Sequence, residues 1–168
     1  MFEKYSTGRI GVFIDEANLF HSQKTLGWRI DYQKLFLILY ELNLGLRNIF
    51  LGYIQENTKQ INFHLKLIDY GYIVHSKKVK EIKDKNGSTN RKGNLDAELA
   101  LDAFQFNDIY DTLILFSGDS DFSYLIDILK ERNKKIIIVS TKDHVSIELL
   151  KRGKFIEINK LRNLIEFI

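Results

Sequence analysis

The sequence predicts an α/β protein, built as a three-layer α/β/α sandwich around a mainly parallel central sheet. Short apolar runs alternate along the chain with segments of helical periodicity, which is the order of strand–helix–strand units. The runs at residues 112–116 and 135–139 are continuously apolar, as strands covered by helices on both faces are. Right-handed crossovers then bring the carboxyl ends of the parallel strands to one edge of the sheet.

Each expected strand is a run rich in branched or aromatic apolar residues, bounded by turn residues or by a helical pattern. In chain order, the expected strands are residues 10–15, 49–54, 72–74, 112–116, 135–139 and 155–158. Residues 77–83 continue the third strand as an exposed, alternating arm of a hairpin. Residues 84–90 gather turn-forming side chains and predict a loop.

The helices between these strands are predicted from apolar periodicity and from capping residues. Asp31, Thr58 and Asn94 are expected N-caps, and Gly71 is expected to close the second full helix. In chain order, we expect a short helical turn from residue 18 and helices at 31–42, 58–70, 94–106, 122–130 and 145–151.

Length and composition favour a single soluble domain spanning residues 1–168, large enough to bury a substantial core. The chain has no cysteine, which excludes disulfides, thiolate zinc sites and cysteine nucleophiles. The first nine residues lack an apolar signal core, and no apolar run approaches the length of a membrane span. We therefore expect a cytoplasmic protein with no membrane contact. Its exposed apolar faces allow a homodimer.

The charge of the chain is unevenly placed. The whole chain carries +3, but residues 76–92 alone carry about +5. Lysines and arginines crowd this segment, and it adjoins an acidic candidate site, so it is the expected surface for a polyanionic backbone. A solvated charged face is the alternative. The residues expected to bind nucleic acid are Lys77, Lys78, Lys80, Arg91 and Lys92.

Acidic side chains follow two of the expected strands where each strand ends. Asp119 and Asp121 come shortly after the strand at 112–116, and Asp15 ends the strand at 10–15, with Asn18 close behind. Ligands of open α/β sheets bind at this edge. Carboxylates brought together there repel one another unless a cation or a proton offsets the charge. Oxygen ligands of this kind suit a hard divalent metal ion.

Asp96 is the third element of this acidic set, in the first turn of its expected helix. A carboxylate at that place also interacts favourably with the helix dipole, and Asp119 also suits an N-cap. Each acid alone therefore has an ordinary structural explanation. Their joint occurrence at two strand ends and one helix start favours a shared acidic site.

Three motifs together resemble the NYN domain family, the LabA-like or DUF88 branch of the PIN-like nuclease superfamily. They are Phe-Ile-Asp-Glu-Ala-Asn-Leu at 13–19, Lys-Gly-Asn-Leu-Asp at 92–96 and Leu-Phe-Ser-Gly-Asp-Ser-Asp-Phe at 115–122. The resemblance covers about residues 10–158. The last motif is specific when it is coupled to the upstream Asp-x-x-Asn.

The resemblance implies a Rossmann-like, PIN-like sheet and a site that holds Mg²⁺ or Mn²⁺ for hydrolysis of RNA, single-stranded RNA being favoured. It implies metal binding by Asp15, Asp96, Asp119 and Asp121, with Asn18 and Ser117 orienting a water or a phosphate. Lys92 would contact a phosphate beside the site, or would be an ordinary solvated lysine. Gly153 stands near the place where many members carry a further aspartate. A one-metal site or a weak enzyme would survive that change.

Other residues are weaker candidates. Tyr53, Tyr72 and Trp28 could stack on bases, although core packing is the commoner role of single aromatic residues. His21 could approach the site but reads as an ordinary surface or packing histidine. Asp102 lies six residues beyond Asp96 and therefore on another face of the helix.

The leading functional hypothesis is a metal-dependent endoribonuclease. The alternative from another class is an RNA-binding regulatory protein on the same fold with little or no cleavage, because fold does not decide function. A phosphatase of the haloacid dehalogenase type is a third reading of Asp119-Ser120-Asp121. That family places its first aspartate directly at the strand end, whereas Ser117 and Gly118 intervene here.

Overall fold

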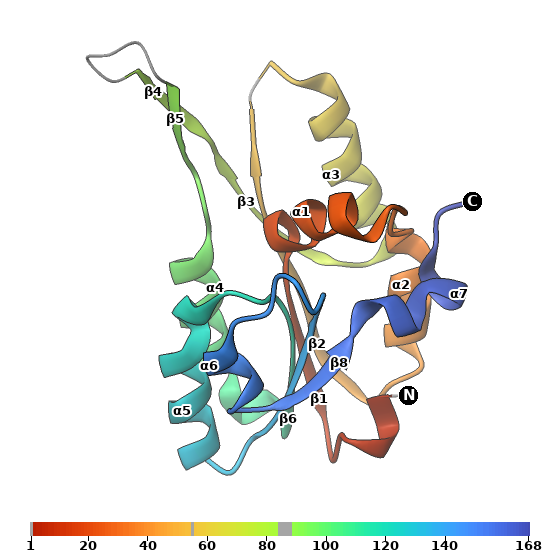
Figure 1. The fold of residues 1–168 in the computed structure, drawn as a ribbon, viewed down its shortest axis with the longest axis vertical. Helices are drawn as coiled ribbons and strands as arrows, with labels where there is room; N and C mark the ends of the chain where they lie inside the picture. Colours follow the sequence, from red (N-terminus) through yellow and green to blue (C-terminus); the bar gives the residue numbers. More distant parts are fainter. Residues whose placement is uncertain (1, 55, 84–88) are drawn as a thin grey trace.

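In the computed structural model, which describes residues 2–54, 56–83 and 89–168, the described strands form a six-stranded parallel sheet and a separate two-stranded ribbon (Figure 1). Helices cover both faces of the large sheet, which confirms the expected three-layer sandwich. The strands of the large sheet are β1 Ile10–Asp15, β2 Leu44–Tyr53, β3 Ile73–Lys78, β6 Thr112–Phe116, β7 Lys135–Ser140 and β8 Lys154–Glu157.

The order in which strands are added to the sheet reverses at its centre, between β1 and β6. The order is β3-β2-β1-β6-β7-β8, and every adjacent pair is parallel. The chain runs outward from β1 to β3, then returns and adds β6 on the other side of β1. This is the doubly wound order in which the crevice between β1 and β6, at their carboxyl ends, is the usual ligand site.

Alternate residues of each strand enter two separate cores. Ile10, Val12 and Ile14 of β1 pack into one core, and Phe13 packs into the other. Side chains along a strand alternate between its two faces, so Asp15 lies on the same face of β1 as Phe13. By the same rule, Ser117, directly after the neighbouring strand β6, lies on the same face as Leu115. The parity of the two strands therefore places Asp15 and Ser117 on the same side.

The helices divide between these two cores. The first core lies beneath α1 Glu16–Leu26, α2 Tyr32–Tyr40, α3 Thr58–Tyr70 and α7 Arg162–Ile165. The second core lies beneath α4 Asp96–Gln105, α5 Ser123–Glu131 and α6 Ile147–Leu150. Short 3₁₀ turns complete the fold at η1 Phe2–Lys4, η2 Asn107–Ile109, η3 Ser120–Phe122 and η4 Ile158–Leu161.

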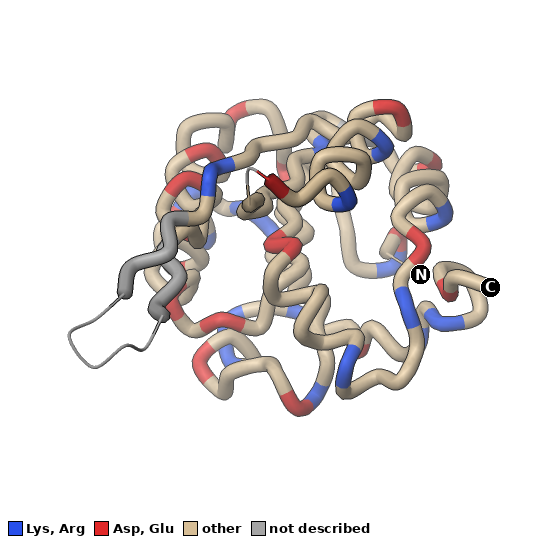
Figure 2. Tube along the Cα trace, turned by 90° about the horizontal axis from the view of Figure 1, so that it is seen from above, with Lys and Arg blue, Asp and Glu red and all other residues tan. Residues whose placement is uncertain are grey.

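Seen from above in Figure 2, acidic and basic residues are interspersed over both helical layers. No helix within the described ranges is both long enough and apolar enough to cross a membrane.

The N-terminal ends of α1, α3 and α4 differ from the sequence prediction in their first residue or in their capping residue. Helix α1 begins at Glu16 rather than near Asn18, because the Asp15 side chain is the N-cap and accepts from the Asn18 backbone at 3.1 Å. Asn57, not Thr58, caps α3. Asn94 does not cap α4, since its amide instead donates to Asp96 Oδ2 at 2.6 Å. The expected caps Asp31 and Gly71 are confirmed.

Several segment boundaries also differ. Strand β2 begins at Leu44, five residues earlier than expected, and η4 and α7 at the carboxyl end were not predicted. The expected hairpin is confirmed as the antiparallel pair β4 Lys80–Lys83 and β5 Thr89–Lys92, which projects from the body in Figure 1. Of the expected loop at 84–90, residues 84–88 lie outside the described residues, and the last two belong to β5.

Candidate functional site

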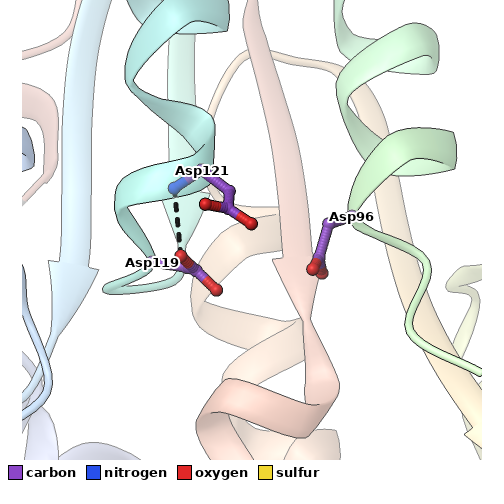
Figure 3. Close-up of side chains that lie close together, drawn as sticks. All are labelled: Asp96, Asp119 and Asp121. Atoms are coloured by element: carbon purple, nitrogen blue, oxygen red, sulfur yellow. Dashed lines mark hydrogen bonds between the residues drawn. The ribbon is translucent and has the colours of Figure 1, made fainter. Parts of the chain in front are cut away.

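Three carboxylates meet beside the end of β1. Asp96 is the first residue of α4, Asp119 is the N-cap of η3, and Asp121 lies within η3. One carboxylate oxygen from each lies within 4.8 Å of the others. Figure 3 shows Asp96 on one side of the end of β1, and Asp119 and Asp121 on the other. Residues from two separate segments thus share one small space at the predicted edge.

The turn after β6 places two of these carboxylates. The Asp121 backbone N–H donates to Asp119 Oδ1 at 3.0 Å, and this bond is the cap of η3. The second oxygen of Asp119 is left free of that bond. Asp119 is half-buried and Asp121 is exposed, so the group opens to solvent.

Asp15 lies beneath this group and is bound differently. It is only 8% exposed, and both of its oxygens accept hydrogen bonds. Oδ1 accepts from the Asn18 N–H at 3.1 Å, and Oδ2 accepts from Ser117 Oγ at 2.9 Å. Asp15 is not a member of the group of three mutually close carboxylates.

Ser117 and Asn18 connect the ends of β1 and β6. The Ser117 hydroxyl accepts from the Asp119 N–H at 3.2 Å while it donates to Asp15. Asn18 Oδ1 accepts from the Gly118 N–H at 3.2 Å. These bonds hold the turn after β6 against the start of α1, and the structure brings both polar residues into contact with Asp15.

Gly118 is required by close packing. A Cβ at this position would lie 2.0 Å from the His144 carbonyl oxygen. The Ser146 N–H also donates to the Gly118 carbonyl at 2.9 Å. The segment after β7 therefore presses directly on the turn that carries Asp119.

Charge repulsion marks the site electrostatically. Burial, together with the charges of Asp15, Asp119 and Asp121, raises the pKa of Asp96 to about 6. Burial also raises the pKa of Asp15, with the Asp119 charge adding to the effect, although the bonds from Asn18 and Ser117 oppose it. Acids that resist ionisation in this way gain stability when a cation is bound between them.

The residues present fit a hard divalent cation. Asp96, Asp119 and Asp121 offer carboxylate oxygens at mutual distances suited to one ion, and no described side chain forms an ion pair with any of them. A hollow of about 30 Å³ lies against Asp15 and Asp96. Gly52 and Gly93 are among its lining residues, and their backbones pack closely, since a Cβ on Gly52 would lie 3.0 Å from the Gly93 carbonyl oxygen.

Glu16 is a titratable neighbour of the site that the sequence analysis did not single out. Its carboxylate accepts from the hydroxyl of the buried Tyr32 at 3.4 Å. Burial, and then the Asp15 charge, raise the pKa of Glu16 to about 7. The alternation of side chains along β1 could have predicted this position, because the residue after Asp15 faces the opposite side of the sheet, where Tyr32 packs.

The residues expected to bind nucleic acid are only partly described. Lys77 is exposed and pairs with Glu98 at 2.5 Å, and Lys78 is exposed as well. The side chains of Lys80, Arg91 and Lys92 lie outside the described residues. The backbone of β5 leads directly to α4, so the hairpin adjoins Asp96 in the chain as expected.

Two of the three aromatic residues considered for base stacking are core residues, which is the commoner role that the sequence analysis gave to single aromatic residues. Tyr72 is buried and donates its hydroxyl to the Tyr32 carbonyl at 2.9 Å. Trp28 is buried and donates to Asn159 Oδ1 at 3.0 Å. Tyr53 is half-buried and packs edge-on against His64.

The remaining weak candidates lie apart from the carboxylate group. Asp102 lies 3.4 Å from His75 Nδ1, and His21 is exposed against Phe20. Gly153 precedes β8 and would place a Cβ 2.8 Å from Ile136 Cγ2, near the amino ends of the strands. Gly153 therefore lies at the opposite edge of the sheet from Asp96, Asp119 and Asp121, so the absence of an acid at this position does not change their site.

Comparison with known proteins identifies the family of the chain and agrees with its fold. The profile of the NYN domain matches residues 9–159. The low amplitude and bright protein LabA of Synechococcus elongatus is 31% identical over 168 residues, covering 96% of this chain and 90% of that protein. The crystal structure of VPA0982, a protein of unknown function from Vibrio parahaemolyticus, superposes with a TM-score of 0.76 at 25% identity, covering 94% of this chain and 96% of that one. On these matches, the chain belongs to the NYN domain family.

Proposed function

We propose that this protein is a metal-dependent endoribonuclease that hydrolyses phosphodiester bonds of single-stranded RNA. The observation that carries the proposal is the meeting of Asp96, Asp119 and Asp121 at the switch point of the sheet, with carboxylate oxygens within 4.8 Å of one another. Membership of a family in the PIN-like nuclease superfamily supports the reaction class.

The proposed roles follow from the contacts of each residue. Asp96, Asp119 and Asp121 would hold Mg²⁺ or Mn²⁺, with Asp15 as a further acid beneath them. When bound, the cation would neutralise phosphate charge and lower the pKa of an attacking water. Ser117 and Asn18 hold the turn after β6 and fix the Asp15 carboxylate in place by their hydrogen bonds.

The proposed substrate follows from the shape and charge around the carboxylates. Asp96 and Asp119 are half-buried, so a flexible single strand reaches them more readily than a stiff duplex. The lysine-rich strand end at Lys77 and Lys78 adjoins the site and would contact the RNA backbone. A cytoplasmic location remains a prediction, as does a homodimer.

Cleavage of a labelled single-stranded RNA tests the proposal. Wild type is assayed with Mn²⁺, with Mg²⁺ and with chelator, beside Asp119→Asn and the matched control Asp69→Asn on the exposed side of α3. We expect cleavage by wild type and by Asp69→Asn, loss of cleavage with chelator, and a decrease of at least about a hundredfold in Asp119→Asn.

Any one of three results would contradict the nuclease proposal. Wild type that binds the RNA but shows no metal-dependent turnover would favour the RNA-binding regulatory protein. Equal activity of Asp119→Asn and Asp69→Asn would show that the three carboxylates are not needed for cleavage. Hydrolysis of small phosphomonoesters with no effect on RNA would indicate a phosphatase.

A further inference from the structure

A second feature of the molecule lies at the opposite edge of the sheet from the carboxylates. It is an open hollow of about 570 Å³ formed by three segments that are distant in the sequence. Its lining residues are 4–5, 130, 134–136 and 151–154, and we call this hollow the basic hollow. The turns that lead into β7 and β8 lie in the lower part of Figure 1, away from α1 and α3.

Position in the sheet separates the basic hollow from the acidic site. Lys135 is the first residue of β7 and Lys154 is the first residue of β8, so the hollow lies at the amino ends of these strands. The carboxylates lie beyond the carboxyl ends of β1 and β6. With a rise of about 3.3 Å per residue, the length of β7 puts the two edges roughly 17 Å apart.

The lining of the hollow has one sign of charge. The connection between α5 and β7 contributes Lys130, Lys134 and Lys135. The turn between α6 and β8 contributes Lys151, Arg152 and Lys154, and η1 contributes Lys4. None of the described residues that line the hollow is acidic. Cations held this close repel one another, and a polyanion in the hollow relieves that repulsion.

Local contacts account for only some of these cations. Arg152 Nε pairs with Asp127 at 2.9 Å, and Lys134 Nζ donates to the Tyr110 carbonyl at 2.8 Å. Among the described residues, no carboxylate forms an ion pair with Lys130, Lys135 or Lys151. Lys130 lies in the last turn of α5 and Lys151 is the C-cap residue of the short helix α6, so both suit a helix end through its dipole, but no such role covers Lys135.

An aromatic ring stands in the same hollow. Tyr5 is half-buried, and Lys154 Nζ lies 4.4 Å from the centre of its ring. Lys4 Nζ lies 5.8 Å from the same centre. Cations combined with an aromatic ring are the components of surfaces that track single-stranded nucleic acid.

We propose that the basic hollow is a second binding site for the RNA backbone, on the edge opposite the carboxylates. The proposal rests on the proposed function, because it takes RNA to be the polyanion. An RNA strand long enough to pass along β8 from the carboxylates would contact both edges at once. The breadth of the hollow favours an extended backbone over a single small phosphate, and the Tyr5 ring beside Lys154 offers a stacking surface for a base that a lipid headgroup would not use.

Binding measured apart from cleavage tests the proposal. Affinity for a long single-stranded RNA is measured with chelator present, over a series of salt concentrations, for wild type and for Lys135→Ala with Lys151→Ala. The matched control is Lys66→Ala with Lys160→Ala, two exposed lysines that do not line the hollow. Loss of two backbone contacts should weaken binding several-fold and lower the slope of log affinity against log salt by about 1.4. The control pair should match wild type.

Further variants separate charge from folding and identify the partner. Lys135→Arg with Lys151→Arg keeps the charge and should keep wild-type affinity. Unchanged affinity and slope in the alanine pair would overturn the proposal, and so would an equal loss in the control pair. Vesicles of anionic lipid that bind through these lysines while RNA does not would assign the hollow to a membrane surface instead.

The readouts also keep this proposal apart from the nuclease proposal. If wild type shows no metal-dependent cleavage but its RNA affinity still depends on Lys135 and Lys151, the nuclease proposal is rejected and the RNA-binding role of the basic hollow is retained. Cleavage that depends on Asp119, with affinity independent of these lysines, would do the reverse.

Discussion

Ser117 donates its hydroxyl to Asp15 Oδ2 at 2.9 Å and so joins the ends of β6 and β1, the two strands between which the sheet order reverses. The two residues are 102 positions apart in the sequence. Since the Asp119 N–H donates to the same Ser117 oxygen, this serine relates the buried Asp15 to the turn that carries the solvent-facing carboxylates.

Removal of this hydroxyl should destabilise the protein and weaken the site. Ser117→Ala leaves Asp15 Oδ2 buried without its partner, and we expect a loss of about 1–3 kcal/mol in the free energy of unfolding. Urea unfolding measures this loss, and RNA cleavage measures the effect on the site. Ser140→Ala is the matched control, because Ser140 is also buried at a strand end but its hydroxyl has no hydrogen-bond partner among the described residues. Equal losses in both variants would contradict the assigned role of the Ser117 bond.

Metal-free stability should decrease as the pH rises from 5 to 8. The pKa of Asp96 is raised to about 6 from its ordinary 3.8, and the pKa of Glu16 to about 7 from 4.5, so the folded chain binds protons more tightly than the unfolded chain. The stabilisation from these protons is complete below the unfolded pKa values and is lost as the pH passes through about 6 and about 7. Thermal unfolding with chelator at several pH values measures the trend.

Two variants assign this pH dependence to its sources. Glu16→Gln should flatten the part of the curve near pH 7, and Asp96→Asn should flatten the part near pH 6. Asp69→Asn should leave the curve unchanged. A curve that keeps its wild-type shape in both Glu16→Gln and Asp96→Asn would place the dependence elsewhere in the molecule.

A divalent cation should stabilise the folded protein, and more strongly at pH 8 than at pH 5. Ionised Asp96, Asp119 and Asp121 bind the ion, whereas protonated carboxyls do not. Ion at a hundred times its dissociation constant should add about 2.7 kcal/mol. The rise in Tm with Mn²⁺ or Mg²⁺ measures this effect, which should be lost in Asp119→Asn and kept in Asp69→Asn. A shift that persists in Asp119→Asn would indicate another ion site.

Gly118→Ala should be more damaging than an ordinary glycine substitution. Its Cβ would lie 2.0 Å from backbone oxygen of His144, so the turn after β6 or the segment after β7 must move. We expect a loss of about 1–3 kcal/mol together with lower RNA cleavage. Gly27→Ala is the comparison, since its Cβ would meet nothing within 4 Å and only the φ of +71° opposes it, at about 1 kcal/mol. A smaller loss at Gly118 than at Gly27 would contradict the close packing.

Much of the local structure follows from the sequence because it depends on neighbours in the chain. The continuous apolar runs predict β6 and β7 nearly to their ends, and Asp31 and Gly71 bound α2 and α3 as their capping chemistry predicts. Caps fail as predictions where a side chain has a stronger partner. Asn94 bonds to Asp96 rather than to the start of α4, and Asp15 caps α1, so that this helix begins at Glu16 rather than near Asn18.

The sequence by itself determined the alternation of strands and helices, and it placed Asp15, Asp96, Asp119 and Asp121 at the ends of particular segments. Only the tertiary structure decided that three of these carboxylates meet while Asp15 is held beneath them by Ser117 and Asn18. It also decided that residues 4–5, 130, 134–136 and 151–154 line one basic hollow. The physical reason is that periodicity and capping act within a few residues, whereas strand order and close packing bring together groups that local patterns do not relate.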